Sequence, residues 1–450
     1  MLKTIRLRKG LNIRLKGTAE KIFIKTARTE FFAIKPPDFH YITPKMEVKV
    51  NDKVKVGSIL FHDKYRPDIL FSSPVSGVVE EIKRGERRRI LEVIIKADEK
   101  DEFIDFGKAD PVSISKEDII NKLLKSGLWP FIRQRPYGII ANPADTPKSI
   151  FISAYNSAPL APDCDYVVTG EEKSFQTGIY ALSKLTNGKI HLNVNGKYPP
   201  SPVYAKAKNV QLNSFIGKHP AGNVGVQIHH IDPINKGDIV WYLYPQDVIT
   251  IGRFFKKGIY DTNRIVALTG SEVEKPRYFK TSMGACIKEI IKDNIKSDNV
   301  RFISGDVLTG TKIIADGFLS FYDTQLTVIP EGNQYEMFGW LLPGFKKFSI
   351  SRTFLSWLMP DRKYTVNTNL HGGKRAFVIT GEYEKVLPMD IYPMQLLKAI
   401  MVEDIDKMEQ LGIYEVIEED FALCEFVCPS KTEIQSIIRK GLDLIKKEME

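Results

Sequence analysis

Cysteine is scarce in this sequence of 450 residues, and long apolar runs are missing from it. Four cysteines are too few for a disulfide framework in a chain of this length, so we expect reduced thiols. No apolar run reaches the ~18 residues that a membrane-spanning helix needs. The N-terminal residues alternate polar and apolar side chains and lack the apolar centre of a signal peptide. These absences predict a soluble protein of the cytoplasm.

Signatures of nucleotide binding and of nucleophilic catalysis are also missing. No Walker loop or G-x-G-x-x-G fingerprint opens a helix, and no Ser/His/Asp or Cys/His set is apparent. We therefore expect the isolated chain neither to hold a nucleotide tightly nor to turn over a substrate alone. Its net charge of +10 and isoelectric point near 9.1 fit an anionic membrane surface or an acidic protein partner. Nucleic acid is not expected, because the known aromatic and basic modules are absent.

The C-terminal region holds half of an iron–sulphur motif. Cys424, Cys428 and the following proline form the run C-x3-C-P, whereas a bacterial ferredoxin site reads C-x2-C-x2-C-x3-C-P. The two missing cysteines would stand where the chain has Glu418 and Phe421. Two thiolates and a phenyl ring cannot hold a cluster. The pattern predicts the frame of an iron–sulphur module without its cluster, with Cys424 and Cys428 as structural remnants and no metal.

Hydrophobic periodicity predicts an α/β multidomain protein with five regions. Residues 1–105 alternate with period two and resemble the barrel-sandwich hybrid of biotinyl and lipoyl proteins. Residues 112–255 alternate helices and strands, which favours a largely parallel, Rossmann-like α/β sheet. Residues 256–330 combine short strands, one helix and tight turns, as a small β-grasp domain does. Residues 331–380 are left unassigned, and residues 381–450 are predicted to be helical.

Domains of these kinds in this order resemble the flavin-binding subunit of respiratory complex I and the C subunit of the Rnf complex. In those proteins a glycine-rich loop of the Rossmann-like domain cradles the FMN phosphate at a helix N-terminus. The equivalent stretch here is SGLWPFIRQRPYG at 126–138, in which aromatic residues, arginines and prolines take the place of glycines. We therefore expect this loop to have lost its flavin.

Nearly the whole chain is similar to the NqrA family, the A subunits of the Na+-translocating NADH:quinone reductases. The stretches that carry the resemblance are SGLW at 126–129, HPAGNVGVQIHHIDP at 219–233, ALTGSEV at 267–273, ISGDVLTGT at 303–311 and EFVCP at 425–429. Together they are specific, although each one alone is weak. The same resemblance implies that the β-grasp region is of the SLBB type.

The resemblance implies a peripheral subunit on the cytoplasmic face of the bacterial inner membrane. It would belong to a six-subunit pump that oxidises NADH, reduces a quinone such as ubiquinone and exports sodium. Its partners would be the C to F subunits and above all the membrane B subunit. Those partners would hold FAD, FMN, riboflavin and iron–sulphur centres. This chain would carry no cofactor and would contribute to quinone binding.

Aromatic and cationic side chains in the stretch 126–138 are the first candidates for a quinone pocket. Rings stack on a quinone, and a cation can bond a carbonyl that gains charge on reduction. These candidates are Trp129, Phe131, Arg133, Arg135 and Tyr137. The alternative is that the rings fill the lost flavin cavity and the arginines meet carboxylates.

Phe39 and His40 offer a second candidate loop, in which His40 could supply a proton near neutral pH. His219, His229 and His230 suggest a metal, but neighbouring residues of a strand point to opposite faces, so we expect no metal there. Two other functions stay open at this point. The chain could be a subunit that keeps flavin or a cluster in a diverged site, or a scaffold that never touches quinone.

Overall fold

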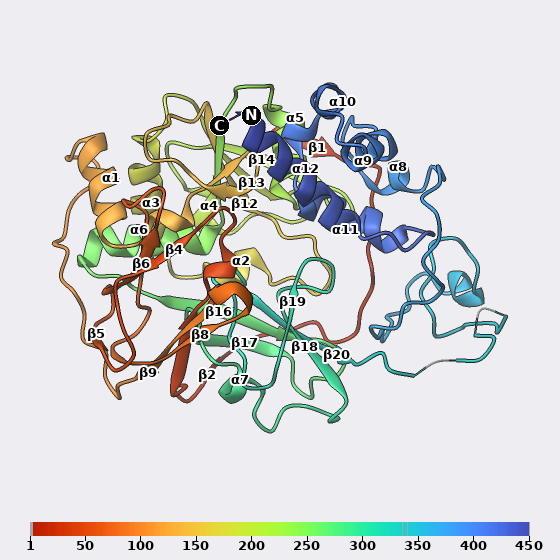
Figure 1. Cartoon of the computed structure of the whole chain (residues 1–450), viewed down its shortest axis with the longest axis horizontal. Helices are drawn as coiled ribbons and strands as arrows, with labels where there is room; N and C mark the ends of the chain where they lie inside the picture. The colour runs from red at the N-terminus through yellow and green to blue at the C-terminus, as the bar shows by residue number, and fades with distance from the viewer. Residues whose placement is uncertain (1–2, 335, 340, 450) are drawn as a thin grey trace.

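Four β-sheets and a group of C-terminal helices make up the part of the chain that the computed structural model describes, residues 3–334, 336–339 and 341–449. Figure 1 shows the largest sheet and the C-terminal helices in its upper half, and the other sheets below them. Among the described helices, none combines the length and apolar character needed to cross a bilayer.

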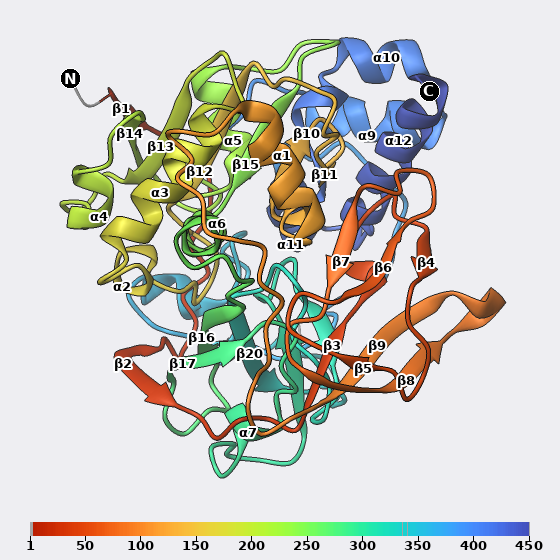
Figure 2. The same cartoon turned by 90° about the vertical axis from the view of Figure 1, so that its left-hand side faces the viewer.

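Figure 2 shows two small antiparallel sheets near the N-terminus. They share one apolar core, to which the stacked rings of Phe61 and Phe71 belong. The four-stranded sheet has the order β3-β9-β8-β5 and the three-stranded sheet the order β4-β6-β7. Their strands are β3 (Phe31–Ile34), β4 (Pro44–Met46), β5 (Lys53–Val54), β6 (Ile59–Asp63), β7 (Leu70–Ser72), β8 (Gly77–Arg84) and β9 (Ile90–Ala97). The short 3-10 helices η1 (Pro36–Asp38) and η2 (Glu86–Arg88) lie in their connections.

The first two strands join other sheets, so the expected single β domain over residues 1–105 needs correction at its start. Strand β1 (Lys3–Arg6) pairs in parallel with β14 of the largest sheet, and β2 (Glu20–Lys25) pairs in parallel with β17. Partners more than 200 residues away leave no local signal, because alternation predicts a strand but not its neighbour.

The largest sheet has seven strands in the order β1-β14-β13-β12-β15-β10-β11, and its first five strands are parallel. Its remaining strands are β10 (Arg133–Arg135), β11 (Ile139–Ile140), β12 (Ser149–Ala154), β13 (Ile190–Asn195), β14 (Gln211–Ile216) and β15 (Val240–Leu243). The predicted, largely parallel sheet is confirmed. Strands β12, β13 and β14 follow one another outward from the middle of the sheet. The next strand, β15, lies on the other side of β12, so the strand order reverses between β12 and β15.

Successive residues of β12 face two different cores, which explains its unbroken apolar run at 150–152. Ile150 and Ile152 of β12 belong to the core under helices α3 and α6, while Phe151 belongs to the core shared with the C-terminal helices. Helices α3 and α6 pack closely because Gly252 has no side chain: a Cβ there would lie 1.8 Å from the Ser174 carbonyl oxygen. The helices of this region are α1 (Lys116–Lys125), α2 (Cys164–Val167), α3 (Glu172–Ser183), α4 (Pro202–Ala205), α5 (Val224–Ile231) and α6 (Pro245–Lys257), with η3 at Trp129–Phe131.

The third sheet has six strands in the order β19-β18-β20-β16-β17-β2. Its strands besides β2 are β16 (Asn263–Thr269), β17 (Arg277–Ser282), β18 (Val300–Ser304), β19 (Thr311–Ile313) and β20 (Gln325–Pro330), with the short helix α7 (Lys288–Ile291) beside them. The stretch 331–380, which sequence patterns left unassigned, has η4 (Leu355–Leu358) as its one helix among the described residues and no strand longer than a single bridge.

The C-terminal region is helical, as predicted. It contains α8 (Tyr383–Val386), α9 (Pro393–Met401), α10 (Ile405–Gln410), η5 (Ile413–Glu415), α11 (Glu418–Val427) and α12 (Ile434–Met449). Helix α11 lies close to α5, where a Cβ on Gly225 would be 2.5 Å from the Asp420 carboxylate. Phe421, Cys424 and Cys428 are fully buried in one apolar cluster.

A buried ion-pair group joins this helical region to the large sheet. The guanidinium of Arg135, at the end of β10, donates to Asp420 and to Glu419 at the start of α11, at 2.7 Å each. The side chains of Arg135 and Asp420 are inaccessible to solvent, and that of Glu419 is 26% exposed. Removing a charge from water is costly, and pairing of this kind offsets that cost.

Replacing Arg135 is therefore expected to destabilise the packing of the C-terminal helices against the large sheet. Arg135→Met leaves the Asp420 carboxylate buried without its cation, and we expect it to lower the free energy of unfolding by about 3 kcal/mol or more. Urea denaturation followed by circular dichroism measures the change. Lys374→Met is the matched control, because Lys374 and its partner Glu433 are largely exposed, and it should have no measurable effect. Equal midpoints for both variants would contradict the assigned role of Arg135.

A chain of polar side chains runs through the core of the large sheet. Asn193 donates to Gln227 of α5 at 3.0 Å, Asn213 donates to Asn193 at 2.9 Å, and His191 lies 3.4 Å from Asn213. Burial, with smaller effects of Lys189 and Lys3, lowers the pKa of His191 to about 4. The native protein therefore keeps this imidazole neutral at a pH where the unfolded chain protonates it.

This shift predicts a loss of stability in acid. The unfolded histidine takes up a proton below its ordinary pKa of about 6.5, whereas the folded one does so only near pH 4, so stability falls as the pH drops through that window. Between about pH 7 and about pH 5, the free energy of unfolding of the parent should fall by about 2 kcal/mol more than that of His191→Gln. Denaturation curves at the two pH values measure this. If the free energies of unfolding of the parent and of His191→Gln fell by the same amount between the two pH values, His191 would not be the group that lowers stability in acid.

Candidate functional site: a cavity at the switch point of the parallel sheet

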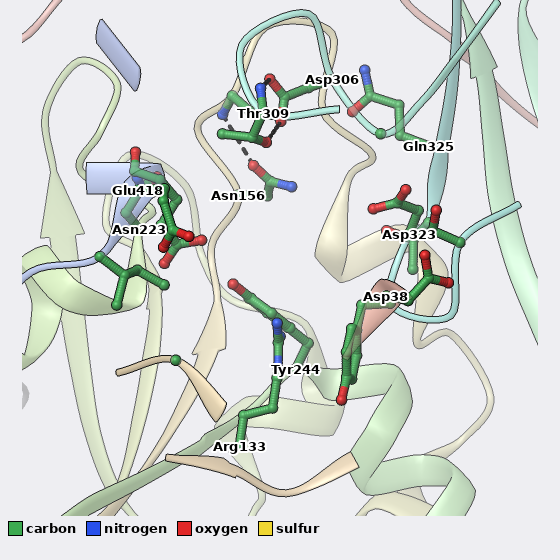
Figure 3. Close-up of a pocket in the computed structure, with 18 of the residues that line it drawn as sticks. Asp38, Arg133, Asn156, Asn223, Tyr244, Asp306, Thr309, Asp323, Gln325 and Glu418 are labelled. Atoms are coloured by element: carbon green, nitrogen blue, oxygen red, sulfur yellow. Dashed lines mark hydrogen bonds between the residues drawn. The ribbon is translucent and has the colours of Figure 1, made fainter. Parts of the chain in front are cut away.

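A cavity of about 620 Å³ lies beyond the carboxyl ends of β12 and β15. Asn156, two residues after β12, and Tyr244 with Pro245, directly after β15, line it (Figure 3). The strand order reverses between these two strands, and ligands of doubly wound sheets bind in the crevice that such a reversal opens. The position of the cavity therefore follows from the topology of the sheet.

Besides the large-sheet region, the N-terminal, third-sheet and C-terminal regions supply its walls. Asp38 and its neighbours come from η1, Tyr322 and Asp323 precede β20, and Asp306 with Thr309 lies in the loop between β18 and β19. Glu418 and Glu419 come from the start of α11. In the view of Figure 3, Arg133 and Tyr244 stand at one end and Asp306 and Thr309 at the other. The cavity thus exists only where all four regions pack together.

Arg133 is the most unusual residue of the cavity. Its guanidinium carbon lies 4.2 Å from the ring centre of Tyr322, 4.6 Å from that of Tyr242 and 5.0 Å from that of Tyr244. Its Nε and Nη2 atoms are buried and have no hydrogen-bond partner, and among the described residues no carboxylate pairs with it. Aromatic faces stabilise a cation but accept no conventional hydrogen bond. The guanidinium therefore keeps donor capacity toward a ligand.

His219 supplies a second unpartnered donor. Ser157 Oγ accepts from the Gly222 N–H at 2.8 Å, so its own hydroxyl hydrogen is available for His219 Nδ1 at 3.1 Å. This arrangement leaves the proton of the neutral ring on Nε2, which is buried without a partner. Burial lowers the pKa of His219 to about 4, with the carboxylates of Asp306 and Asp420 opposing the shift. The ring is therefore neutral near pH 7.

Carboxyl groups form the facing wall. Asp38 accepts from the Phe321 N–H at 2.8 Å and lies 3.8 Å from the Lys35 ammonium, while Asp323 accepts from Ser304 Oγ at 2.6 Å. Desolvation raises the pKa of Asp38, and it raises the pKa of Asp323 to about 6, where the Asp38 charge adds to it. A carboxyl with such a pKa can take up or release a proton near neutrality.

Three of the seven side chains predicted from sequence line the cavity: Phe39, His40 and Arg133. Phe39 packs between Phe71 and Phe321, and His40 lies 3.9 Å from Glu418. Partial burial and the nearby Arg439 lower the pKa of His40, which makes its cationic form less favourable. Phe39 and His40 also line a second cavity, of about 470 Å³, together with Arg84, Arg88 and Arg89.

The other four predicted side chains do not line the cavity. Trp129 is buried and donates to the Ala141 carbonyl at 2.7 Å, and Phe131 stacks on Phe321 under the Arg264 guanidinium. Arg135 is held by its two carboxylates, and the Tyr137 ring meets that of Tyr414 edge-on. Here the rings fill the core and one arginine meets carboxylates, which are the surroundings that the alternative interpretation expects. None of the four lines this cavity.

Sequence patterns missed several lining residues. Tyr242 and Tyr244 lie at the carboxyl end of β15. Ligands of open α/β sheets bind at the carboxyl ends of parallel strands, so the sequence could have predicted these two residues. Tyr322 and Asp323 could not be found in this way, because they belong to another sheet region and reach the cavity only through the packing of domains.

The residues present do not fit an FMN phosphate or an iron–sulphur cluster. In the stretch 126–138, Gly127 touches the N-terminal sheets, where an added Cβ would be 2.2 Å from Ser72 Oγ, so no open glycine cradle remains. Five carboxyl side chains line the cavity and would repel a phosphate: Asp38, Asp306, Asp323, Glu418 and Glu419. At the expected cluster position Glu418 pairs with Arg439, and Cys428 Sγ accepts from the Tyr383 hydroxyl at 2.9 Å.

The paired histidines lie at the end of helix α5, so the strand expected there is wrong. His229 Nδ1 lies 2.6 Å from Glu415 and its Nε2 accepts from the Asp390 N–H, while His230 Nε2 is 2.8 Å from the Pro388 carbonyl oxygen. Within the described ranges, no group of three or more His, Cys, Asp or Glu side chains is arranged to hold a metal ion.

Comparison with family models gives three matches along the chain. Residues 5–98 match the NqrA N-terminal barrel-sandwich hybrid domain, residues 114–260 the NqrA second alpha/beta domain, and residues 265–314 the NQRA C-terminal domain. The order and approximate extent of these matches agree with the N-terminal sheets, the doubly wound sheet and the third sheet.

Comparison with curated proteins gives matches over the full length. The A subunit of the Na(+)-translocating NADH-quinone reductase of Rhodopirellula baltica is 40% identical over 449 residues, with 98% of both chains covered. The proteins of the same name from Neisseria meningitidis and Yersinia pestis are 39% and 37% identical, covering 99% of this chain and 100% of theirs. Since identity of this level extends through the N-terminal sheets, the doubly wound sheet, the third sheet and the C-terminal helices, the chain belongs to the NqrA family, the A subunits of the Na(+)-translocating NADH-quinone reductases.

Proposed function

We propose that this chain works as the A subunit of a Na+-translocating NADH:quinone reductase and that its cavity binds the quinone headgroup. Membership of the family supports the first part. The observation that carries the second part is Arg133, a cation that lines the cavity, is surrounded by three tyrosine rings and has no anionic partner among the described residues.

A quinone headgroup matches the chemistry of this wall. Its flat ring can stack on the face of Tyr244, and its carbonyl oxygens can accept from Arg133 and from His219 Nε2. When electrons arrive, negative charge develops on the same oxygens, and a cation fixed beside them stabilises that charge. Reduction to the quinol takes up two electrons and two protons, and Asp323, with its pKa raised to about 6 by desolvation, is placed to pass a proton.

The electrons would come from a redox centre in another protein of the complex. Under this proposal the partners are the C to F subunits and above all the membrane B subunit, which together carry the FAD, FMN, riboflavin and iron–sulphur centres. The chain itself would sit as a peripheral subunit on the cytoplasmic face of the bacterial inner membrane. Its C-terminal helices would be a degenerate iron–sulphur module, in which Glu418 and Phe421 replaced two thiolate ligands.

Quinone binding by the isolated chain tests the role of Arg133. A short-chain ubiquinone titrated by calorimetry should bind the parent, and Arg133→Leu should bind about tenfold more weakly or less, because a charged hydrogen bond is lost. Arg301→Leu is the matched control, since Arg301 pairs with Glu331 away from the cavity, and it should bind like the parent. His219→Asn gives a second variant, in case Arg133→Leu alters folding. No binding by the folded parent would favour the scaffold function instead.

Cofactor content tests the rival redox function. Protein purified under anaerobic conditions should contain neither flavin nor iron at stoichiometric amounts, because the residues at both expected sites do not fit those groups. Absorption spectroscopy and iron analysis measure this. One flavin or one cluster per chain would identify a redox-active protein and would overturn the assignment of a cofactor-free chain.

A further inference from the structure

Residues 336–339 and 341–379, which we call the apolar segment, concentrate exposed apolar side chains. Of the twenty-four large apolar side chains exposed in the described part of the molecule, eleven lie in this segment. They are Met337, Phe338, Leu341, Leu342, Phe345, Leu355, Trp357, Leu358, Leu370, Val378 and Ile379. Met337 is 84% exposed and Leu341 71%. In Figure 1 the segment forms the light blue loops at the right, away from the sheets.

The same segment is strongly basic. Its sequence holds seven Lys or Arg residues against two Asp or Glu residues, so about a tenth of the chain contributes half of the net charge of +10. The cations lie close to the apolar groups: the Arg352 guanidinium is 5.4 Å from the Trp357 ring centre, and Lys346 follows Phe345 directly. Apolar and cationic side chains therefore occupy one exposed region.

The inner side of the segment is tied to the rest of the protein, so its outer side is held in place. Tyr364 is buried, its N–H donates to the Arg14 carbonyl at 2.7 Å, and Arg14 in turn donates to Asp361 at 2.6 Å. Phe348 lies between the rings of Tyr364 and Phe426. These contacts leave the exposed apolar residues uncovered within the described chain.

We propose that the apolar segment is a membrane-contact surface that binds anionic phospholipid. Tryptophan, phenylalanine and leucine favour the boundary between headgroups and acyl chains, and lysine and arginine are drawn to anionic headgroups. Apart from η4 the described part of the segment has no helix, so its unpaired backbone groups exclude deep insertion and place it at the headgroup level. The inference stands independently of quinone binding in the cavity.

A lipid surface explains the composition better than a protein partner does. The centres of protein interfaces are depleted of lysine, whereas this segment intersperses four lysines with its apolar residues. Its described residues also offer no regular strand edge or long helix on which a protein partner could add a complementary element. The excess of positive charge is complementary to an anionic bilayer.

Sedimentation of the full chain with vesicles tests the proposal. We expect it to bind vesicles of phosphatidylcholine containing phosphatidylglycerol, to bind pure phosphatidylcholine far less, and to dissociate as salt is added. The triple variant Leu341→Ser, Leu342→Ser, Trp357→Ser removes apolar contacts, and the triple variant Lys346→Glu, Arg352→Glu, Lys363→Glu reverses charge. Each should bind the anionic vesicles at least about tenfold more weakly.

The control removes exposed apolar groups elsewhere, with Tyr65→Ser, Tyr198→Ser and Val402→Ser, which are 74%, 60% and 73% exposed in the parent. It should bind the anionic vesicles like the parent. All altered side chains of the apolar variant are exposed, so thermal unfolding curves should stay close to that of the parent. Absence of binding by the folded parent, or equal binding by the parent and both segment variants, would overturn the proposal. If the two segment variants failed to assemble with the membrane proteins of the complex but still bound vesicles, the proposal would also be overturned. The segment would then contact a protein partner.

Discussion

The buried Arg135 guanidinium is the contact on which the arrangement of the functional region depends. It holds the start of α11 against β10, the strand next to the edge of the large sheet, through Asp420 and Glu419. Neither carboxylate has another cation within ion-pair distance in the described structure. Glu418 and Glu419, from the same helical turn, form a wall of the cavity. A shift of this helix would therefore change the cavity directly, although Arg135 itself does not line it.

Charge pairing and apolar packing hold the C-terminal helices against the rest of the protein. Where a ferredoxin-like segment would place thiolates, this chain places an acidic turn that meets Arg135 and Arg439, and a phenyl ring that fills the apolar core. Cys424 and Cys428 remain inside that core, and the Tyr383 hydroxyl donates to Cys428 Sγ. Ion pairs and apolar burial can thus keep the helices in place without any contribution from a metal.

Sequence patterns predicted those parts of the fold whose signal is local. The stretch 149–154 and the stretch 190–194, in which apolar residues alternate with His191 and Asn193, identified two of the parallel strands, and both faces of each strand are buried. The neighbours of β1 and β2 could not be predicted, since a strand pattern contains no information about a partner far along the chain.

The candidate site could be predicted only in part, because contacts with residues far along the chain decide which side chains line it. Arg133 and Arg135 look equivalent in sequence, and both lie near Tyr242. Only the distant carboxylates of α11 separate the buried ion pair from the unpaired cation.

The central claim is that the unpaired Arg133 guanidinium marks the place where a quinone headgroup binds. A crystal structure of the chain with a short-chain ubiquinone tests this most directly. We expect a headgroup inside the cavity, with one carbonyl oxygen within hydrogen-bond distance of Arg133 and the ring against the tyrosine side chains. A headgroup bound elsewhere on the chain, with the cavity occupied only by water, would contradict it.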